Sequence, residues 1–544
     1  MIMNISRRRF LVESAGVSAA ALLTGPPAIH SRSEQRPALV IRGGGIVDGS
    51  GAAAREGDLV ITDTRITSVF GRAPATGTVE IDARGLAVAP GFIDIHSHAD
   101  SSISDDPRSE SVIRQGVTTI VAGQDGSSRG APFTSAAFSA MLAAYDSIPV
   151  SVNVASMVGL GTLRGDVIGS DAREATAAEL QRMSEMVEGA LAGGACGASS
   201  GLEYTPGAFA NANELIALCK PLAARGLPYA THMRNEDDRL LDSIDESIAV
   251  TRAAGCPLQI SHLKTQGPRN WSKLDDVFRR IAAARRGGMD ITFDRYPYTA
   301  YATGLSNLFP LWSREGGTAA LVRRMAESAT ADRVRAETMA KVEMIGGWDN
   351  VMITGGLSNA ELRGVVGQNM GRFAASLGID PYELARRLLA QGNPGMVGFA
   401  MSEENLDRIL AHPQAMVCSD GGGFAIDGAA RRGSPHPRGL GSFPRVLGRY
   451  VRERRALQLA DAIRKMTAAP AARLRLGDRG RLAPGMAADI VVFDPVTVSD
   501  RATYEEPFQY PAGISLVVVN GKVALRDGER AASGSGRSLR PLPR

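Results

Sequence analysis

Eight short apolar segments alternate with helix-like segments along most of the chain, and this alternation strongly limits the possible folds. The apolar segments are rich in β-branched residues and have the length of buried strands. They are Phe92–His98, Thr118–Ala122, Val150–Ala155, Gly197–Leu202, Pro228–His232, Leu258–His262, Ile291–Phe293 and Ala415–Cys418. Helix-like stretches such as Ala177–Leu191 and Leu274–Arg285 lie between them. Repeated strand–helix units favour a parallel sheet, so we predict an α/β fold with a TIM-like (β/α)8 barrel over residues 91–474.

The segments on either side of the barrel predict a second, smaller domain. Strand-like runs occur within residues 35–90 and again within residues 475–530. We expect the two ends of the chain to combine in one small β-sandwich domain. Residues from about 299 to 414, before the last barrel strand, are too many for a loop and predict an inserted lid subdomain. Residues 531–544 are rich in Gly, Ser, Arg and Pro, so we expect a disordered tail.

The N-terminus has the pattern of an export signal. Arg7, Arg8 and Arg9 precede Phe10 and Leu11, and an Ala-rich apolar stretch and a Gly-Pro-Pro turn follow. Basic, apolar and turn regions in this order are typical of a cleaved signal, and the arginines resemble a Tat signal. We therefore expect residues 1–34 to be a Tat-type signal peptide and the mature protein to be periplasmic or secreted. No other segment is apolar enough to span a bilayer, so no stable membrane anchor is expected.

Charge and cysteine content exclude several other classes of protein. The net charge is only +4 over 544 residues, and no Lys/Arg stripe is present, so no nucleic-acid partner is expected. The four cysteines form no CxxC pair, which argues against a zinc ribbon or a dithiol redox motif.

Polar side chains at the ends of the predicted strands indicate a metal site. Functional groups in such barrels gather at the carboxyl ends of the strands, and residues two apart on a strand share a face. Imidazoles end three strands and carboxylates follow four others, so we predict a site for one or two divalent ions, with Zn²⁺ favoured by the imidazole content. The candidate ligands are His96, His98, Asp125, His232, His262 and Glu203.

The same residues resemble the amidohydrolase superfamily and, more narrowly, its D-aminoacylase (N-acyl-D-amino-acid deacylase) branch. The resemblance extends from about Val40 to Lys522. It rests on the His-x-His pair, the single histidines after the fifth and sixth strands, the Asp after the eighth, and the runs Ser200–Tyr204, Thr231–Arg234, Ile260–Lys264, Asp294–Tyr298, Cys418–Gly421 and His436–Arg438. It implies a metal-dependent hydrolase whose partner is a small N-acyl amino acid or a related amide.

One ligand position departs from the branch. A cysteine after the second strand ligates zinc there, and this chain has Asp125 at that position. A carboxylate is a harder ligand than a thiolate, so the preference for zinc should weaken and Mn²⁺ or another harder ion becomes acceptable. Many superfamily members also use a carboxylated lysine after the fourth strand to bridge two metals, and here Glu203 is the residue available. We prefer Asp125 as the bridging carboxylate because it occupies the branch's ligand position.

The resemblance implies hydrolysis of the amide bond of N-acyl-D-amino acids by a water that the metal activates. Asp420 is expected to accept the water's proton and to deliver it to the leaving amine, because an amine cannot leave as an anion. Lys264 resembles the residue that holds the substrate carboxylate in this branch. Tyr296 is a second candidate for that role, and Arg438 is a third because a guanidinium fork matches a carboxylate.

Two alternatives stay open from the sequence. The same metal centre could serve a dipeptidase or a cyclic-amide hydrolase, because the lid and the carboxylate-binding residues decide the substrate. A catalytically inactive periplasmic binding protein on the same barrel is disfavoured because Asp420 is retained. The acyl group, the side-chain preference and the oligomeric state are left open.

Overall fold

The structure is a computed structural model that describes residues 39–71, 79–357, 362–531 and 534–543. The predicted Tat-type signal over residues 1–34 lies outside the described residues. Within those residues, no helix is both long enough and apolar enough to cross a membrane.

Eight parallel strands form the predicted barrel. In order around the barrel they are β6 (Phe92–Asp94), β7 (Val117–Ala122), β8 (Asn153–Ser156) continued by β9 (Val158–Gly159), β10 (Ala198–Gly201), β11 (Tyr229–His232), β12 (Leu258–Ile260), β13 (Ile291–Arg295) and β17 (Ala415–Val417). The barrel closes between its last and first strands, where the Asp420 amide donates to the His96 carbonyl and the His98 amide donates to the Gly421 carbonyl, both at 2.9 Å. Each strand coincides with one of the predicted segments, so the predicted fold is confirmed.

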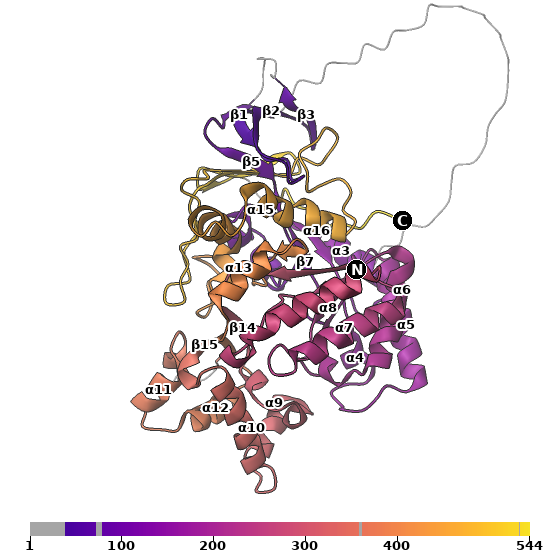
Figure 1. Cartoon of the computed structure of the whole chain (residues 1–544), viewed down its shortest axis with the longest axis vertical. Helices are drawn as coiled ribbons and strands as arrows, with labels where there is room; N and C mark the ends of the chain where they lie inside the picture. The colour runs from indigo at the N-terminus through magenta and orange to yellow at the C-terminus, as the bar shows by residue number, and fades with distance from the viewer. Residues whose placement is uncertain (1–38, 72–78, 358–361, 532–533, 544) are drawn as a thin grey trace, which may run out of the picture. The chain divides into compact units, whose positions relative to one another are not determined.

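Amphipathic helices cover the outside of the barrel. Helix α5 (Ala177–Ala192) begins at a capping box between Thr176 and Glu179 and buries Met183, Val187 and Leu191 at helical spacing. Figure 1 shows α5 among a group of neighbouring helices that follow successive strands. The group comprises α4 (Leu160–Val167), α5, α6 (Ala212–Arg225), α7 (Leu240–Ala254) and α8 (Leu274–Arg286).

Strands from both ends of the described chain form one nine-stranded sheet. Its strands are β1 (Leu39–Ile46), β2 (Arg55–Thr62), β3 (Arg65–Gly71), β4 (Val79–Asp82), β5 (Ala87–Pro90), β18 (Ile490–Phe493), β19 (Ile514–Val519), β20 (Lys522–Arg526) and β21 (Glu529–Arg530). The two halves meet where β18 pairs antiparallel with β5. Their apolar side chains share one core. Only Gly91 separates β5 from β6, so this sheet anchors the first barrel strand and the histidines that follow it.

The predicted insertion before the last barrel strand contains its own sheet and helices. Strands β14 (Ala300–Gly304), β16 (Gly395–Phe399) and β15 (Val351–Gly355) form an antiparallel sheet in that order. Helices α9 (Gly317–Arg324), α10 (Ala331–Met344), α11 (Met370–Ser376) and α12 (Pro381–Leu389) lie together beside this sheet (Figure 1). Residues of β14 and α10 reach the cavity at the barrel mouth described below.

The predicted disordered tail requires a correction. Residues 534–543 run along the barrel, where the Leu539 amide donates to the Val154 carbonyl at 2.8 Å and the Val154 amide donates to the Arg537 carbonyl at 3.0 Å. Val154 lies in β8, and this barrel strand pairs with β10 only from Val158 onwards, so β10 does not reach Val154. The tail supplies the missing backbone partner, which its polar composition did not reveal.

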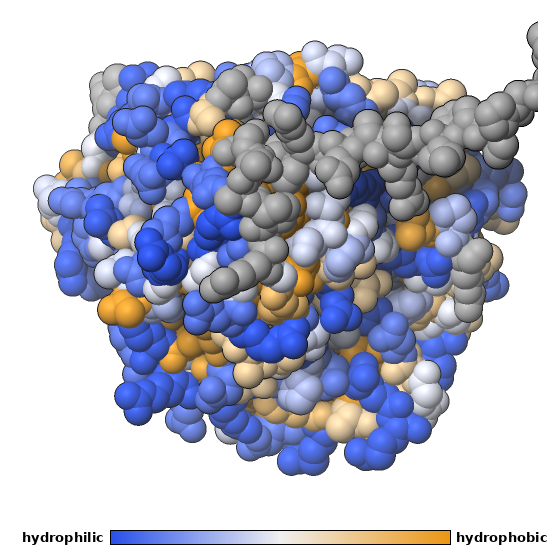
Figure 2. Space-filling view, turned by 90° about the horizontal axis from the view of Figure 1, so that it is seen from above, coloured by the Kyte–Doolittle hydropathy of each residue, from blue (hydrophilic) through white to orange (hydrophobic). Residues whose placement is uncertain are grey.

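Apolar side chains are concentrated in the cores of the barrel, the sheet and the insertion. The face of the molecule in Figure 2 is accordingly dominated by hydrophilic residues, with hydrophobic residues scattered among them. Scattered apolar residues of this kind are ordinary for a folded protein surface.

Candidate metal centre and active site

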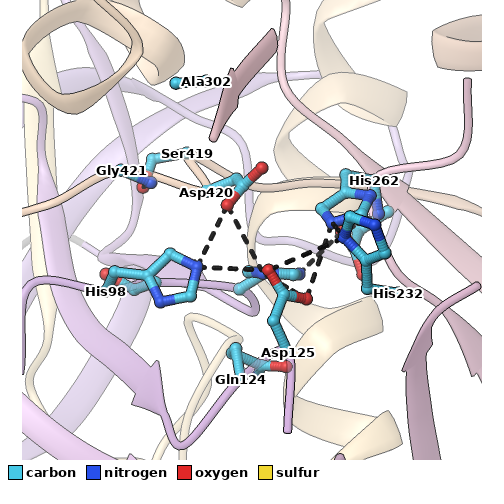
Figure 3. Close-up of polar contacts among 12 residues, drawn as sticks. His98, Gln124, Asp125, His232, His262, Ala302, Ser419, Asp420 and Gly421 are labelled. Carbon is cyan, nitrogen blue, oxygen red and sulfur yellow. Dashed lines mark hydrogen bonds and ion pairs between the residues drawn. The ribbon is translucent and has the colours of Figure 1, made fainter. Parts of the chain in front are cut away.

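Two histidines and two carboxylates meet at the mouth of the barrel, as the sequence predicted. Figure 3 labels three of them, His98, Asp125 and Asp420. The Nε2 atom of His96 lies 3.4 Å from Oδ1 of Asp125 and 3.5 Å from Oδ1 of Asp420. The Nε2 atom of His98 lies 3.4 Å from Asp125 Oδ2 and 3.2 Å from Asp420 Oδ1. Four ligands placed 2.0–2.1 Å from one tetrahedral zinc ion stand about 3.3 Å apart. The donor atoms therefore have the spacing of a first coordination sphere.

The other two predicted histidines extend this cluster on the far side of Asp125. His262 Nε2 lies 3.5 Å from Asp125 Oδ1, and His232 Nδ1 lies 4.0 Å from Asp125 Oδ2. The two rings approach each other, with His232 Nδ1 3.0 Å from His262 Nε2. Asp125 thus contacts all four imidazoles, which makes it the carboxylate best placed to bridge two ions.

The turns that follow the barrel strands hold these side chains in unusual backbone conformations. Asp125, His262 and Asp420 all have positive φ values, of 52°, 36° and 49°. A non-glycine residue in this region is strained by about 1–3 kcal/mol, and such strain is found most often at functional sites. This backbone conformation directs each side chain into the barrel mouth shortly after its strand ends.

Each buried histidine has a carboxylate behind it. His96 Nδ1 lies 3.5 Å from Asp294, His262 Nδ1 lies 3.2 Å from Glu236, and His232 Nε2 lies 3.4 Å from Glu203. Carboxylates at the outer nitrogen of a ligating imidazole fix its tautomer and orientation. At these distances the outer nitrogens of His96 and His232 make no hydrogen bond within the described residues, so here the carboxylates place negative charge beside the rings.

Glu203 is placed differently from its predicted role. It was considered as an alternative bridging ligand, but its carboxylate faces the outer nitrogen of His232. Ligand atoms converge in two groups, and Glu203 belongs to neither; the groups are His96, Asp125, His262 and Asp420, and His232, Glu236 and His262. The reason is that Glu203 follows the end of β10 by two residues, so the turn directs it beside the cluster and not into it. It still lines the catalytic cavity.

Glu236 was not identified from the sequence, and it changes the role of Lys264. The Lys264 ammonium donates to both oxygens of Glu236, at 2.6 and 2.7 Å, and lies 2.6 Å from His262 Nδ1. Gln266 donates to the same carboxylate at 2.9 Å. Lys264 lines the cavity, but its charge is already paired, so it holds Glu236 and His262 in place. The only sequence signal for Glu236 was its position four residues after His232, in a loop whose path the sequence does not define.

Arg438 and Tyr296 lie together on the other side of the cavity. Arg438 Nη1 donates to Asp420 Oδ2 at 2.7 Å, and its guanidinium lies 4.7 Å from the centre of the Tyr296 ring. The Tyr296 hydroxyl is buried and has no hydrogen-bond partner among the described residues. Both side chains line the cavity. Arg438 is paired with Asp420 through Nη1 alone, and a guanidinium has five N–H donors, so both side chains remain suited to a substrate carboxylate.

The electrostatics of the cluster favour a bound cation. Burial opposes a charge on His98, but Asp125 and Asp420 outweigh it and raise the pKa of His98 to about 9. Burial would raise the pKa of Asp420, yet Arg438 and the imidazoles hold it below its usual range. Among the residues that the structure describes, His96 Nε2 and Asp125 Oδ1 are buried and have no hydrogen-bond partner. Buried polar atoms rarely stay unpaired, so these residues fit a divalent ion held by imidazoles and carboxylates.

The cluster forms the floor of a cavity of about 340 Å³. The opposite wall comes from the insertion and includes Tyr301, Ala302 and Thr303 of β14 and Lys341 of α10. A cavity of this size holds a small organic molecule in contact with both the ligand atoms and Arg438.

Comparisons with known proteins agree with this geometry. Residues 79–525 match the model of the amidohydrolase family. The chain is 37% identical over 500 residues to N-acyl-D-glutamate deacylase of Alcaligenes xylosoxydans xylosoxydans, which covers 89% of this chain and 92% of that protein. It is 34% identical over 527 residues to D-aminoacylase of the same organism, which covers 94% of this chain and 99% of that protein.

A solved structure shows the same architecture. The crystal structure of N-acyl-D-glutamate deacylase from Bordetella bronchiseptica, in complex with zinc and a phosphonate inhibitor, superposes with a TM-score of 0.79 at 36% identity. The match covers 93% of this chain and 99% of the other.

Proposed function

The chain belongs to the amidohydrolase family, and from this premise we propose that it is a metal-dependent hydrolase that removes the acyl group from N-acyl-D-amino acids. The observation that carries the proposal is the convergence of His96, Asp125, His262 and Asp420 on one point of the cavity floor. The relatives that act on N-acyl-D-glutamate and on N-acyl-D-amino acids span nearly the whole chain, which disfavours the dipeptidase and cyclic-amide alternatives.

The ion belongs among His96, His98, Asp125, His232 and His262. When bound, a divalent metal polarises the amide carbonyl and lowers the pKa of a water molecule to near neutrality. Zn²⁺ is supported by the imidazoles and by the zinc in the related deacylase, and Asp125 supports Mn²⁺ as a substitute.

Asp420 handles the protons of the reaction. Its Oδ1 faces the imidazole cluster, while its Oδ2 is fixed by Arg438. Arg438 keeps the carboxylate ionised, which is the form that accepts a proton. Asp420 takes the proton of the attacking water at Oδ1 and then gives it to the amide nitrogen, so that the product leaves as a neutral amine.

Arg438 and Tyr296 orient the substrate. A substrate carboxylate placed beside them gains a charge-assisted hydrogen bond from the guanidinium and one from the unpartnered Tyr296 hydroxyl. The carboxylate then lies on the Asp420 side of the cluster, which sets the scissile amide between Asp420 and the metal ligands. Lys264 contributes indirectly, through Glu236 and His262.

The change Asp420→Asn tests this assignment. The amide keeps the side-chain shape but cannot accept the proton, so we expect kcat for an N-acetyl-D-amino acid to fall by at least about a thousandfold while the metal stays bound. Metal content by mass spectrometry and initial rates by amine release provide the measurement. Wild-type kcat in the variant would show that another group moves the proton.

We also propose that the protein is exported by a Tat-type signal in residues 1–34. The proposal is supported by the twin arginines and the apolar, turn-terminated stretch behind them. Residues 1–34 fused to a folded reporter should direct it to the periplasm, and replacing Arg7, Arg8 and Arg9 by lysine should retain it in the cytoplasm. Unchanged export of the lysine variant would count against the Tat route.

A further inference from the structure

His436 is a buried histidine that lies outside the metal centre and takes no part in the proposed reaction. It comes just before helix α14 (Arg438–Arg445) and two residues before Arg438, the arginine that fixes Asp420. Both nitrogens of its ring make hydrogen bonds within the protein. The orientation of the ring is therefore fixed at both ends.

The two hydrogen bonds also determine where the ring carries its proton. Nδ1 accepts from the backbone amide of Arg438 at 3.0 Å, and Nε2 donates to the carbonyl of Ala300 at 3.0 Å. A backbone amide can only donate and a carbonyl can only accept, so the proton sits on Nε2. A second proton, on Nδ1, would break the bond to Arg438. The geometry therefore requires a neutral ring.

The charges around the ring favour the same neutral form. Burial and the adjacent Arg438 guanidinium lower the pKa of His436 well below its usual range, and Arg295 acts in the same direction. The Ala300 carbonyl and the Asp420 carboxylate raise this pKa, but they do not outweigh the other effects. The ring therefore adds no charge beside the guanidinium of Arg438.

Three tyrosine rings pack edge-on around the imidazole. The ring centres of Tyr296, Tyr298 and Tyr504 lie 6.2, 5.3 and 5.1 Å from that of His436, at interplanar angles of 71°, 89° and 79°. Edge-to-face pairs at about 4.5–7 Å are favourable contacts. Tyr504 belongs to the segment between β18 and β19, so the nine-stranded sheet also supports this ring.

His436 connects Arg438 to the opposite wall of the cavity. Arg438 lines the cavity and donates to Asp420 at 2.7 Å. Ala300 begins β14, and the next residues, 301–303, line the cavity from the insertion. A ring bound on both sides limits the movement of Arg438 relative to this wall. His436 is not one of the described residues that line the cavity, so it would act on a substrate through Arg438.

We propose that His436 is a positioning residue whose neutral imidazole holds the Arg438 backbone, so that the guanidinium fixes Asp420 and meets the substrate carboxylate at the same time. The proposal rests on the proposed function, in which Arg438 performs both tasks. No proton of the reaction passes through His436.

Two substitutions separate the two hydrogen bonds of the ring. His436→Asn places an amide oxygen near the position of Nδ1 and keeps an acceptor for the Arg438 amide. His436→Gln places an amide nitrogen near the position of Nε2 and keeps only the bond to Ala300. Because small misplacements of a site group are costly, we expect His436→Gln to lower kcat/KM for N-acetyl-D-leucine at least about tenfold and His436→Asn to stay within about threefold of wild type. Equal losses in both variants, or wild-type kcat/KM in His436→Gln, would overturn the proposal.

A double-mutant cycle with Arg438→Met tests whether the effect passes through Arg438. Residues that act through one another give non-additive effects, so His436→Gln should change kcat/KM by less than about twofold in the Arg438→Met background. Additive losses would overturn the role, because they would mean that His436 supports the fold in general. The control is Tyr504→Phe, which keeps the ring beside His436 and removes a hydroxyl without a hydrogen-bond partner among the described residues. It should have the kcat/KM of wild type, and a loss as large as that of His436→Gln would also indicate general packing.

Nuclear magnetic resonance tests the ring without substrate turnover. In zinc-loaded protein with ¹⁵N-labelled histidine rings, long-range ¹H–¹⁵N correlations distinguish the two neutral tautomers from the protonated ring. The His436 signals, assigned as those lost in His436→Asn, should show a neutral ring with its proton on Nε2. If no N-acyl-D-amino acid is hydrolysed, or if His436→Gln does not fold, this spectrum still decides whether His436 holds Arg438. A proton on Nδ1 would overturn the proposal.

Discussion

Asp125 is the residue on which the metal preference of this site depends most. It lies within 4.0 Å of all four histidines, and in the proposed metal site it would offer carboxylate oxygens where the branch that the sequence resembles has a cysteine. The substitution Asp125→Cys should raise zinc affinity by at least about tenfold relative to Mn²⁺, because a thiolate is the softer ligand. Competition with a coloured zinc chelator measures this, and unchanged relative affinity would remove Asp125 from the ligand set.

Glu236 tests the importance of the carboxylates behind the histidines. It is buried, and it binds Lys264 and Gln266 while facing His262. The substitution Glu236→Gln should weaken metal binding by about 10- to 100-fold, the usual effect of losing such an outer partner. The matched control is Asp242→Asn, which removes an exposed carboxylate from the following helix. If both variants bind metal like wild type, Glu236 does not orient His262.

At the residue scale, the candidate metal ligands and Asp420 were easier to predict from the sequence than the side chains that pair with the site residues. His96, His98, His232, His262 and Asp420 were recognisable because each follows the end of a buried strand, and parallel strands of a barrel end at one mouth. The pairs Lys264–Glu236 and Arg438–Asp420 were not, because they depend on the paths of loops that no periodic pattern describes. Lys264 therefore looked like a free cation for the substrate.

The C-terminal segment is an element with a measurable contribution to stability. Residues 534–543 supply backbone partners to Val154 and also to Val150, whose carbonyl accepts from Gly536 at 2.9 Å. Each buried backbone group left without a partner costs about 1–3 kcal/mol. Truncation after residue 533 should therefore lower the free energy of unfolding by several kcal/mol in urea denaturation. An unchanged midpoint and slope would show that the segment does not contribute to the barrel.

His412, which follows helix α13 (Glu403–Ala411), gives the stability a pH dependence of known sign. Its ring stacks on Phe278 at 4.5 Å, and burial lowers its pKa to about 4. The unfolded chain takes up a proton near pH 6.5 and the folded protein only near pH 4. This contribution is complete above pH 6.5 and is lost as the pH falls towards 4.

The substitution His412→Phe keeps the stacking and removes the titration. The difference in Tm between pH 7 and pH 5 should therefore be smaller in this variant than in wild type. The same difference in both proteins would mean that His412 is protonated in the folded state at pH 5.

The strands were predictable because each is a short apolar run between turn signals, and eight of them repeat with helices. The order within the insertion was not, since β14, β15 and β16 are separated by helices of ordinary composition and pair in the order 14, 16, 15. The contacts of residues 534–543 with the barrel could not be predicted, because the hydrogen bonds to Val150 and Val154 are made by backbone groups, which are the same in every sequence.

At the scale of the whole molecule, the barrel and the insertion meet at one cavity, and the nine-stranded sheet supports the barrel. The nine-stranded sheet anchors β6, the barrel brings the ligands together, and the insertion supplies the opposite wall with Tyr301 and Lys341. In the proposed function the barrel therefore supplies the reacting groups, and the insertion contributes the wall that a substrate must fit. For this reason the reaction can be predicted from the residues at the strand ends, whereas a prediction of the substrate preference requires the structure.

The most direct measurement is the rate of amine release from matched N-acetyl-D- and N-acetyl-L-amino acids by the purified protein, before and after removal of metal with a chelator. We predict hydrolysis of the D-series, loss of that activity on chelation, and recovery when Zn²⁺ or Mn²⁺ is added back. Full activity in the metal-free protein, or hydrolysis of the L-series alone, would contradict a D-specific deacylase that depends on the histidine cluster.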